Sequence, residues 1–454
     1  MKTPRVGDER DTIAAVATPA GAGGIGIVRV SGPVAVAIAA RVVGREPDAL
    51  PDRRMVLAAA RDPAGGERLD DVMVVVMRAP RSFTGEDVAE LHGHGGAVNM
   101  ARLLRAVVAA GARHAEPGEF TRRAFENGRL DLTRAEAVLA VIEASSERAL
   151  RLAQGQLAGT LGERIGELRG EATALLAELE ASIDFPEEGL DLSARGAVAA
   201  RAAALAAACE RLAATFDAGR ALREGVHVAL CGPVNSGKSS LFNRLVGSER
   251  ALVADEPGTT RDFVEARVVW SGLAVTLIDT AGLREAATGV ERRGIDLGAE
   301  RARRADLEVH LVPAESLRGS SPVASPGEER AGRVLRIVSK GDALERGDAA
   351  PHLVTSAVTG QGIAELEAAI VALVTGDAVE HDEGALLSSE RQRALVVRAA
   401  EGFGRAAEAG RAGQPDEVVA LEVREGVDAL AEVLGESVGE EMLDALFARF
   451  CIGK

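Results

Sequence analysis

Residues Gly232–Ser239, with the sequence Gly-Pro-Val-Asn-Ser-Gly-Lys-Ser, match the phosphate-binding pattern G-x-x-x-x-G-K-[ST]. A strand-like run, Val226–Cys231, precedes this segment and a helical stretch follows it. In that setting the backbone N–H groups of the loop and the N-terminus of the helix hold phosphate oxygens. Lys238 then reaches the β- and γ-phosphates of a nucleotide, and the Ser239 hydroxyl ligates Mg²⁺. A chance glycine turn is the alternative, which the motifs further along the chain disfavour.

Two downstream motifs have the residue types that complete a site for Mg²⁺ and the γ-phosphate. Gly258-Thr-Thr-Arg261 lies where a switch loop supplies a Mg²⁺ ligand, here Thr260. Asp279-Thr-Ala-Gly282 ends the alternating strand Val275–Ile278. The acid that opens this motif is expected to hold Mg²⁺ through water, and the amide of the glycine that closes it meets the γ-phosphate.

Two more motifs predict recognition of a guanine base. Ser339-Lys-Gly-Asp342 follows the strand Leu335–Val338, and the Asp342 carboxylate can accept hydrogen bonds from guanine N1–H and its 2-amino group. Ser356-Ala357 follows a further strand and can present a backbone N–H to guanine O6. Five motifs in this order, all at strand ends, predict a guanine-nucleotide-binding domain.

The motifs depart from the common pattern at two points. Ser339 stands where an Asn normally ties the base-reading loop to the phosphate loop, so a weaker tie is expected. Leu283 stands where Ras-like switches have a water-orienting Gln. Another group must orient the attacking water, and Glu291 and Glu285 are both candidates by spacing.

The predicted secondary structure changes along the chain. The first ~120 residues mix strand-like and helical runs and predict a compact α+β domain. Its expected strands are Thr12–Ala17, Ile25–Val30 and Met73–Met77, and its expected helices are Pro33–Val43 and Met100–Ala110. From Val226 to about Thr375 strands, loops and helices alternate, which predicts an α/β domain with a mainly parallel sheet.

The segments on either side of the α/β region are helical. Capping boxes are expected at Thr133 with Glu136 and at Ser437 with Glu440, the second starting a helix that runs to about Phe450. Helical spacing indicates one continuous apolar face that comprises Leu150, Leu157, Leu161, Ile165 and Leu168. A second, Ala-rich helix is expected from Ser193 to about Ala221. A helical domain interrupted by an inserted α/β domain is the simplest architecture, and four domains in a row is the alternative.

Composition limits the partners. Lys+Arg 53 minus Asp+Glu 69 gives a net charge of −16 over 454 residues, so nucleic acid must be met by a local basic patch or a second protein. Arg122, Arg123, Arg129 and Arg134 are such a candidate, with a solvated helix face as the alternative. The chain has only three cysteines, which predicts a reducing compartment. It has no apolar leader and no apolar run of ~18–20 residues, so a cytoplasmic protein with no membrane partner is expected.

The chain resembles the MnmE (TrmE) family of tRNA-modification GTPases over essentially its whole length. Besides the nucleotide motifs, the resemblance rests on segments near both ends: Ala17-Thr-Pro, Gly23-Gly-Ile-Gly-Ile-Val-Arg29, Phe83-Thr-Gly-Glu-Asp, Glu90-Leu-His-Gly-His-Gly-Gly96, Pro117-Gly-Glu-Phe-Thr-Arg-Arg-Ala-Phe125, Ile183-Asp-Phe-Pro-Glu187 and Cys451-Ile-Gly-Lys454.

The resemblance implies a homodimer with an N-terminal folate-binding and dimerisation domain (1–123), a helical domain in two parts (124–222 and 377–454) and an inserted Ras-like G domain (223–376). It implies a partner, the flavin- and NADH-dependent MnmG, in a heterotetramer. Together they would add a carboxymethylaminomethyl-type group to carbon 5 of the wobble uridine of certain tRNAs. The one-carbon unit would come from a 5-formyl- or methylene-tetrahydrofolate, and GTP hydrolysis would require K⁺ and Mg²⁺.

The resemblance also implies roles for particular residues. Glu291 is the water-orienting glutamate and Cys451 a thiol in the tRNA chemistry. The implied K⁺ ligands are Asn235, Ala254, Glu256 and Thr259, and those for folate are Arg29, Glu90, Arg129 and Lys454. With the motifs above, the expected nucleotide contacts are Asn235, Ser236, Gly237, Lys238, Ser239, Ser240, Ala254, Asp255, Glu256, Pro257, Gly258, Thr259, Thr260, Asp279, Thr280, Ala281, Gly282, Ser339, Lys340, Asp342, Ser356 and Ala357.

Other readings of single features are weaker. Gly21–Gly26 matches G-x-G-x-x-G, but a strand follows it instead of the helix that a dinucleotide site needs. His92 and His94 are a poor metal pair, so a structural or folate-side role is favoured. Cys231 is expected to be buried, and a packing role is the alternative for Cys451. A non-catalytic GTPase switch of ribosome assembly is the alternative function, which leaves Cys451 and Glu90 without a role.

Overall fold

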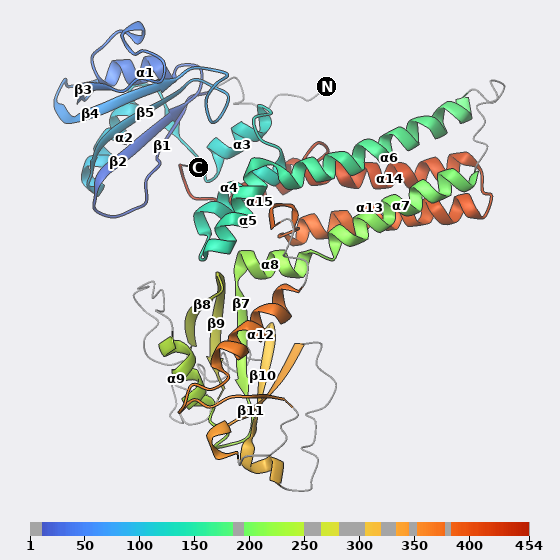
Figure 1. Cartoon of the computed structure of the whole chain (residues 1–454). Helices are drawn as coiled ribbons and strands as arrows, with labels where there is room; N and C mark the ends of the chain where they lie inside the picture. Colours follow the sequence, from blue (N-terminus) through green and yellow to red (C-terminus); the bar gives the residue numbers. More distant parts are fainter. Residues whose placement is uncertain are drawn as a thin grey trace, which may run out of the picture. The chain divides into compact units, whose positions relative to one another are not determined.

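The structure is a computed structural model that describes residues 11–184, 195–248, 265–280, 305–318, 333–344, 352–376 and 383–453 (Figure 1). The chain forms two compact units. The first comprises Met1–Leu139 together with Leu434–Lys454, and the second comprises Ala140–Val433. The C-terminal residues therefore belong to the same unit as the N-terminal ones. No described helix is long and apolar enough to cross a membrane.

The first unit is built on a six-stranded sheet with the order β3-β4-β5-β2-β1-β6, in which only β1 and β6 pair in parallel among the described strands. Its elements are β1 (Ile13–Val16), β2 (Gly23–Ser31), α1 (Ala35–Val42), η1 (Pro47–Ala49), β3 (Val56–Arg61), β4 (Arg68–Met77), β5 (Val88–Gly95), α2 (Ala97–Ala109) and β6 (Arg113–His114). The expected strands and helices of this region are confirmed, with ends that differ by a few residues.

The first core forms because the strands alternate. In β4, Val72, Val74 and Val76 are buried while Asp71 and Met73 are exposed, as a period of two requires. Helices α1 and α2 bury their apolar faces in the same cluster as these valines. The opposite, polar face of β2 and β5 is thereby left for side chains that can do chemistry.

Helices α3 (Glu119–Glu126), α4 (Leu132–Glu143) and α15 (Glu440–Phe447) follow the sheet in the first unit or straddle its boundary, and two capping predictions are wrong here. Helix α4 begins one residue before Thr133, because the Asp131 carboxylate accepts from the backbone N–H of Arg134 at 3.1 Å and from the Thr133 hydroxyl. Helix α15 has Gly439, not Ser437, at its N-cap and ends at Phe447 instead of Phe450.

Four long helices of the second unit, α6 (Thr160–Asp184), α7 (Arg195–Ala213), α13 (Glu390–Arg411) and α14 (Asp416–Leu434), run side by side (Figure 1). Ion pairs join α7 to α6 through Arg201 and Glu178 and α14 to α6 through Arg424 and Glu180. Helix α13 contacts α14 where Gly402 meets Gly426, and α7 where Gly410 meets Ala199. Helices from both sides of the α/β region thus form one bundle, which confirms an inserted domain and excludes four domains in a row.

The expected continuous leucine face is divided between two helices. Helix α5 (Glu147–Ala158) ends at Gly159, which has a left-handed backbone, and α6 starts at the next residue. Leu161, Ile165 and Leu168 are buried, whereas Leu150 and Leu157 are only half-buried. The Ala-rich segment likewise forms two helices, α7 and α8 (Phe216–Glu224).

The second sheet has the order β12-β11-β10-β7-β9-β8, with every described pair parallel except β8–β9. Its elements are β7 (Val226–Cys231), α9 (Lys238–Ser248), β8 (Glu265–Trp270), β9 (Leu273–Asp279), β10 (Leu307–Pro313), η3 (Ala314–Arg318), β11 (Arg333–Ser339), η4 (Gly341–Ala343), β12 (Leu353–Val354) and α12 (Ile363–Thr375). The prediction of a mainly parallel α/β domain is confirmed. The boundaries 123, 222 and 376 stay predictions.

The connections into and out of this domain pass close together. A Cβ at Gly219 of α8 would lie 2.0 Å from the Leu387 carbonyl oxygen, so only glycine fits there. Leu387 follows η6 (Glu383–Ala385) on the return path, and the side chain of buried Gln156 donates to the Leu386 carbonyl at 2.7 Å. The two connections are therefore fixed to each other and to α5.

Candidate functional site

The phosphate loop lies between β7 and α9, where the sequence places it. Gly232 has φ +148°, and a Cβ there would lie 2.8 Å from the Leu311 carbonyl oxygen. Asn235 has φ +62° and Gly237 has φ +89°. These left-handed residues curl the loop, and Asn is among the few non-glycine residues that adopt this conformation readily. The exposed Asn235 side chain stands at the outer turn of the loop.

The loop lysine is held by the loop itself. Lys238 Nζ donates to the carbonyl oxygens of Gly232 at 3.0 Å and Pro233 at 2.8 Å, and the residue is buried. Ser236 is also buried, and its Oγ has no hydrogen-bond partner among the described residues. Ser239 and Ser240 are exposed in the first turn of α9. The Lys238 ammonium group is thus preorganised beside the N-terminus of α9, where an anion such as a phosphate is favoured.

The neighbouring strand β9 brings its acid to the same edge of the sheet. Strands β7 and β9 pair in parallel with Leu230 opposite Asp279, so both end beside the phosphate loop. Asp279 is buried, and the Thr280 hydroxyl donates to the Leu230 carbonyl at 2.7 Å. Ligands bind in parallel α/β sheets at the carboxyl ends of the strands, which is where these groups meet.

The base-reading residues form a second cluster at that edge. Ser339 Oγ donates to the Ser236 carbonyl at 2.7 Å, so serine makes the tie between the two loops at this position. Asp342 lies exposed in η4, and the hydroxyl of buried Ser356 donates to its Oδ1 at 2.5 Å. The Ser356 N–H already donates to the Gln361 carbonyl, which leaves the N–H of Ala357 as the candidate for a base oxygen.

Lys340 completes this cluster in a left-handed conformation, with φ +57°. Its Nζ lies 3.3 Å from Glu315 Oε1. Several expected site residues lie outside the described residues: Ala254, Asp255, Glu256, Pro257, Gly258, Thr259, Thr260, Ala281, Gly282, Leu283, Glu285, Glu291 and Lys454. Their predicted roles stay predictions.

A separate polar cluster lies on the first unit, on the face of β2 and β5 opposite the core. Arg29 and Glu90 are register partners, and Arg29 Nε donates to Glu90 Oε1 at 2.9 Å. The other carboxylate oxygen of Glu90 lies 3.0 Å from His92 Nε2. All three side chains are largely buried, with exposed fractions of 18%, 14% and 18%.

The C-terminal residues reach this cluster. Arg29 Nη1 donates to the Gly453 carbonyl at 3.4 Å, and Pro117 forms a β-bridge with Ile452. The Gly118 N–H donates to the Cys451 carbonyl, while Cys451 itself is exposed. The structure thus brings Arg29 and Glu90 into one unit with the segment that contains Cys451, although Cys451 follows both residues by more than 350 positions in the sequence.

Two aromatic rings lie beside Arg29 of this cluster. The Arg29 guanidinium lies 5.8 Å from the ring centroids of Phe83 and Phe120. Exposed Arg129 packs on Gly85, two residues beyond Phe83. The contact of His92 with Glu90 was not predicted individually, although residues two apart on a strand share a face and could have indicated it.

Two alternatives from the sequence are resolved by contacts. His94 Nδ1 lies 2.7 Å from Asp70 Oδ1 and does not join His92, so the two histidines form no pair. Arg122 pairs with Glu126 and Asp444, and Arg123 pairs with three acids, Asp11, Glu86 and Glu119. These two arginines are therefore committed to ion pairs within the unit and do not offer an open basic patch.

The phosphate loop, the acid of β9 and the base-reading aspartate meet at one sheet edge, an arrangement of the P-loop guanine-nucleotide-binding class. The family descriptions "MnmE helical domain" and "GTP-binding protein TrmE N-terminus" match residues 132–451 and 12–129.

Individual relatives extend the match over nearly the whole chain. The tRNA modification GTPase MnmE of Geobacter metallireducens is 42% identical over 98% of this chain and 99% of its own, and that of Moorella thermoacetica is 41% identical over the same shares. A solved G domain of the T. maritima FeoB iron transporter covers 32% of this chain and 96% of that chain at 27% identity, with a TM-score of 0.23. The chain belongs to the MnmE family and is a GTPase of tRNA modification.

Proposed function

We propose that the chain hydrolyses GTP in a K⁺-dependent cycle and, with MnmG, adds a carboxymethylaminomethyl-type group to carbon 5 of the wobble uridine of certain tRNAs. The hydrogen bond from Arg29 to the Gly453 carbonyl carries this proposal. It supports a site in which Arg29 and its ion-pair partner Glu90, both expected to hold a folate, lie near the C-terminal segment that contains the exposed Cys451. The one-carbon unit comes from a bound 5-formyl- or methylene-tetrahydrofolate.

The side chains of the cluster suit a pterin. A carboxylate such as that of Glu90 accepts from the adjacent N–H donors of an aminopyrimidinone edge, and Arg29 forms an ion pair with this largely buried carboxylate. Phe83 offers an aromatic surface beside Arg29. Arg129, exposed nearby, and Lys454, outside the described residues, are the proposed cationic contacts.

Cys451 is the residue that distinguishes this function from a simple GTPase switch. We expect tRNA from cells with only the Cys451→Ser variant to lack the wobble modification, because serine keeps the volume but forms no thiolate. The purified variant should hydrolyse GTP normally and stay a dimer. Nucleoside analysis of the tRNA provides the test.

Normal modification in the Cys451→Ser variant would contradict the assignment of Cys451 and leave this cysteine a packing residue. Retention of tetrahydrofolate by the purified chain gives a second measure: a Glu90→Gln variant should lose it, and a wild-type chain that retains none would favour the ribosome-assembly alternative.

The cation part of the proposal rests on Asn235. Its amide oxygen is a hard ligand, and its left-handed position in the loop suits an ion beside the nucleotide phosphates. With Ala254, Glu256 and Thr259 it would hold K⁺, while Ser239 and Thr260 would hold Mg²⁺. A monovalent cation there stabilises the charge that develops during hydrolysis.

Hydrolysis should therefore be fast in K⁺ and slow in Na⁺ at equal ionic strength. Glu291→Ala should lower kcat by about 10²–10³-fold with little change in nucleotide affinity, because its role is confined to the transition state. Equal rates in the two salts would remove the K⁺ site. Normal hydrolysis by the Glu291 variant would transfer the water-orienting role to another group, with Glu285 as the next candidate.

The same proposal defines the assembly. The chain acts as a homodimer through residues 1–123 and forms a heterotetramer with MnmG, in the cytoplasm where the tRNA substrate is modified. The family names of its relatives support the tRNA substrate, and size-exclusion chromatography with purified MnmG tests the partnership.

A further inference from the structure

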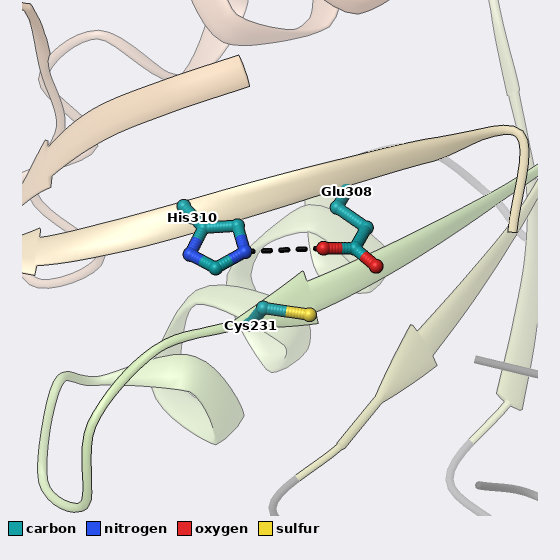
Figure 2. Close-up of side chains that lie close together, drawn as sticks. All are labelled: Cys231, Glu308 and His310. Carbon is teal, nitrogen blue, oxygen red and sulfur yellow. Dashed lines mark hydrogen bonds and ion pairs between the residues drawn. The ribbon is translucent and has the colours of Figure 1, made fainter. Parts of the chain in front are cut away.

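Three side chains with metal-binding chemistry gather on the second sheet, outside the site described above. Cys231 ends β7, and Glu308 and His310 lie on the adjacent strand β10 (Figure 2). Val228, Leu230, Leu307 and Val309 point into the core of this sheet. Because side chains alternate along a strand, Cys231, Glu308 and His310 share the other face.

The strand register sets this cluster. Strands β7 and β10 pair in parallel, with His310 directly opposite Cys231. Glu308 lies two residues before His310 and therefore on the same face of the sheet. His310 Nε2 lies 3.1 Å from Glu308 Oε2, and one ligand atom of each of the three residues lies within 4.8 Å of the others. The histidine and glutamate side chains are 19% and 15% exposed, and Cys231 is half-buried instead of buried as expected.

The three donor types select a class of ion. A thiolate and an imidazole favour Zn²⁺ and similar borderline-soft divalent ions over Mg²⁺ or Ca²⁺, and a carboxylate is a common third ligand. Tetrahedral Zn²⁺ places its ligand atoms roughly 3.4–3.6 Å apart, so a small side-chain rotation would bring the three atoms into a coordination sphere. Three protein ligands leave a fourth position for water.

We infer that Cys231, Glu308 and His310 form a binding site for a divalent ion of the zinc class. Binding breaks the S–H bond of Cys231, forms a metal–sulfur bond and releases the proton to solvent. The site is distinct from the proposed nucleotide Mg²⁺ site, whose expected ligands are the hydroxyl oxygens of Ser239 and Thr260. Cys231 directly precedes that loop, so GTPase activity is a poor readout and the metal itself must be observed.

Cobalt(II) serves as the spectroscopic probe, added to the full-length chain without nucleotide. Wild type should bind one Co²⁺ with an intense sulfur-to-cobalt charge-transfer band in the near ultraviolet and visible bands typical of four-coordinate geometry. Cys231→Ser should lose the charge-transfer band. Cys451→Ser, which removes the exposed thiol of the other unit, should keep it. A band that survives in Cys231→Ser, or its absence in wild type, overturns the inference.

Zinc affinity gives a second measure that does not depend on the cysteine. In competition with a chromophoric chelator, His310→Gln should weaken Zn²⁺ binding at least about 100-fold, since even second-shell substitutions cost 10–100-fold. The matched control is His352→Gln, which alters an exposed histidine of the same domain. Equal Zn²⁺ affinity of His310→Gln and wild type would show that the trio is only a hydrogen-bonded cluster.

Discussion

Asp342 illustrates how a single side chain sets nucleotide choice. Its carboxylate is exposed, and the Ser356 hydroxyl donates to one of its two oxygens. We expect Asp342→Asn to weaken GTP binding by about 3 kcal/mol, or ~100-fold. The reason is that the amide N–H groups of the asparagine would then face the N1–H and 2-amino donors of guanine. The variant should prefer xanthosine triphosphate. Titration with fluorescent nucleotides measures both affinities.

Ser356→Ala provides the matched control, since it removes the supporting hydroxyl but keeps both carboxylate oxygens. It should bind GTP more weakly than wild type and still prefer it to xanthosine triphosphate. Unchanged GTP affinity in Asp342→Asn would mean that another group reads the base.

The position of a motif in the fold was predictable where the motif is local. The phosphate loop and the strand before it, Val226–Cys231, have the predicted positions because a strand, a glycine turn and a helix follow each other directly. The contact that Ser339 makes with the phosphate loop was harder to predict from the sequence. Its short side chain reaches the Ser236 carbonyl only because the two loops approach closely, and this distance is set by the whole sheet.

At the scale of elements, Asp306 joins helix α8 to the second sheet. It lies just before β10 and accepts from Arg220 of α8 at 2.8 Å and from the backbone N–H of His227 in β7 at 2.9 Å. Burial by itself raises the pKa of Asp306, but the hydrogen bonds from His227 and Arg220 outweigh burial and hold the pKa below its ordinary value.

This lowered pKa makes the contribution of Asp306 depend on pH. Because the folded state favours the carboxylate, its stabilisation is complete above the ordinary pKa of 3.8 and is lost as the pH falls through the folded value. Asp306→Asn should therefore lower the free energy of unfolding by about 1–3 kcal/mol at pH 7, and the difference from wild type should shrink below pH ~4. Urea unfolding across this range provides the measurement.

Glu224→Gln is the control for that prediction. Glu224 lies 4.0 Å from the same Arg220, but its side chain is 58% exposed, so its loss should change stability little. A difference between Asp306→Asn and wild type that stays constant with pH would show that the carboxylate acts by packing instead of charge.

The elements themselves were largely predictable, but their ends were not. Alternation in β4 and β9 and the helical spacing of α6 specify the element type, because burial follows the period. The capping prediction at Thr133 failed because its S/T-x-x-E pattern competes with Asp131, which accepts from the N–H of Arg134. Only the path of the chain decides which side chain caps.

At the scale of the whole molecule, the C-terminal segment completes the first unit. Gly118 has φ +69°, and a Cβ there would lie 2.6 Å from the Phe447 carbonyl oxygen, so α3 and α15 meet at a backbone contact. Arg29 and Gly453 are 424 positions apart and still share a hydrogen bond. No local pattern encodes such a pairing. The family resemblance assigned Arg29 and the C-terminal Lys454 to one folate site, but it did not predict this contact.

The separation into two units predicts that damage at this junction stays within the first unit. Phe447 is 2% exposed, and its ring lies 6.5 Å from that of Phe125 and 5.5 Å from that of Phe450. Phe447→Ala should cost about 3–5 kcal/mol, because it leaves a cavity between α3 and α15. Differential scanning calorimetry should show one transition shifted to lower temperature.

GDP affinity of the Phe447 variant decides whether the two units are energetically independent. The phosphate loop and the base-reading residues all belong to the second unit, so the dissociation constant for GDP should match that of wild type within about twofold, since distant sites without shared partners act additively. Ile452→Ala, which truncates a side chain that is 60% exposed in the same segment, should leave both the transition and the affinity unchanged. A Phe447 variant that loses GDP binding together with its first transition would show that the units unfold as one, and the nucleotide site would then depend on the C-terminal segment.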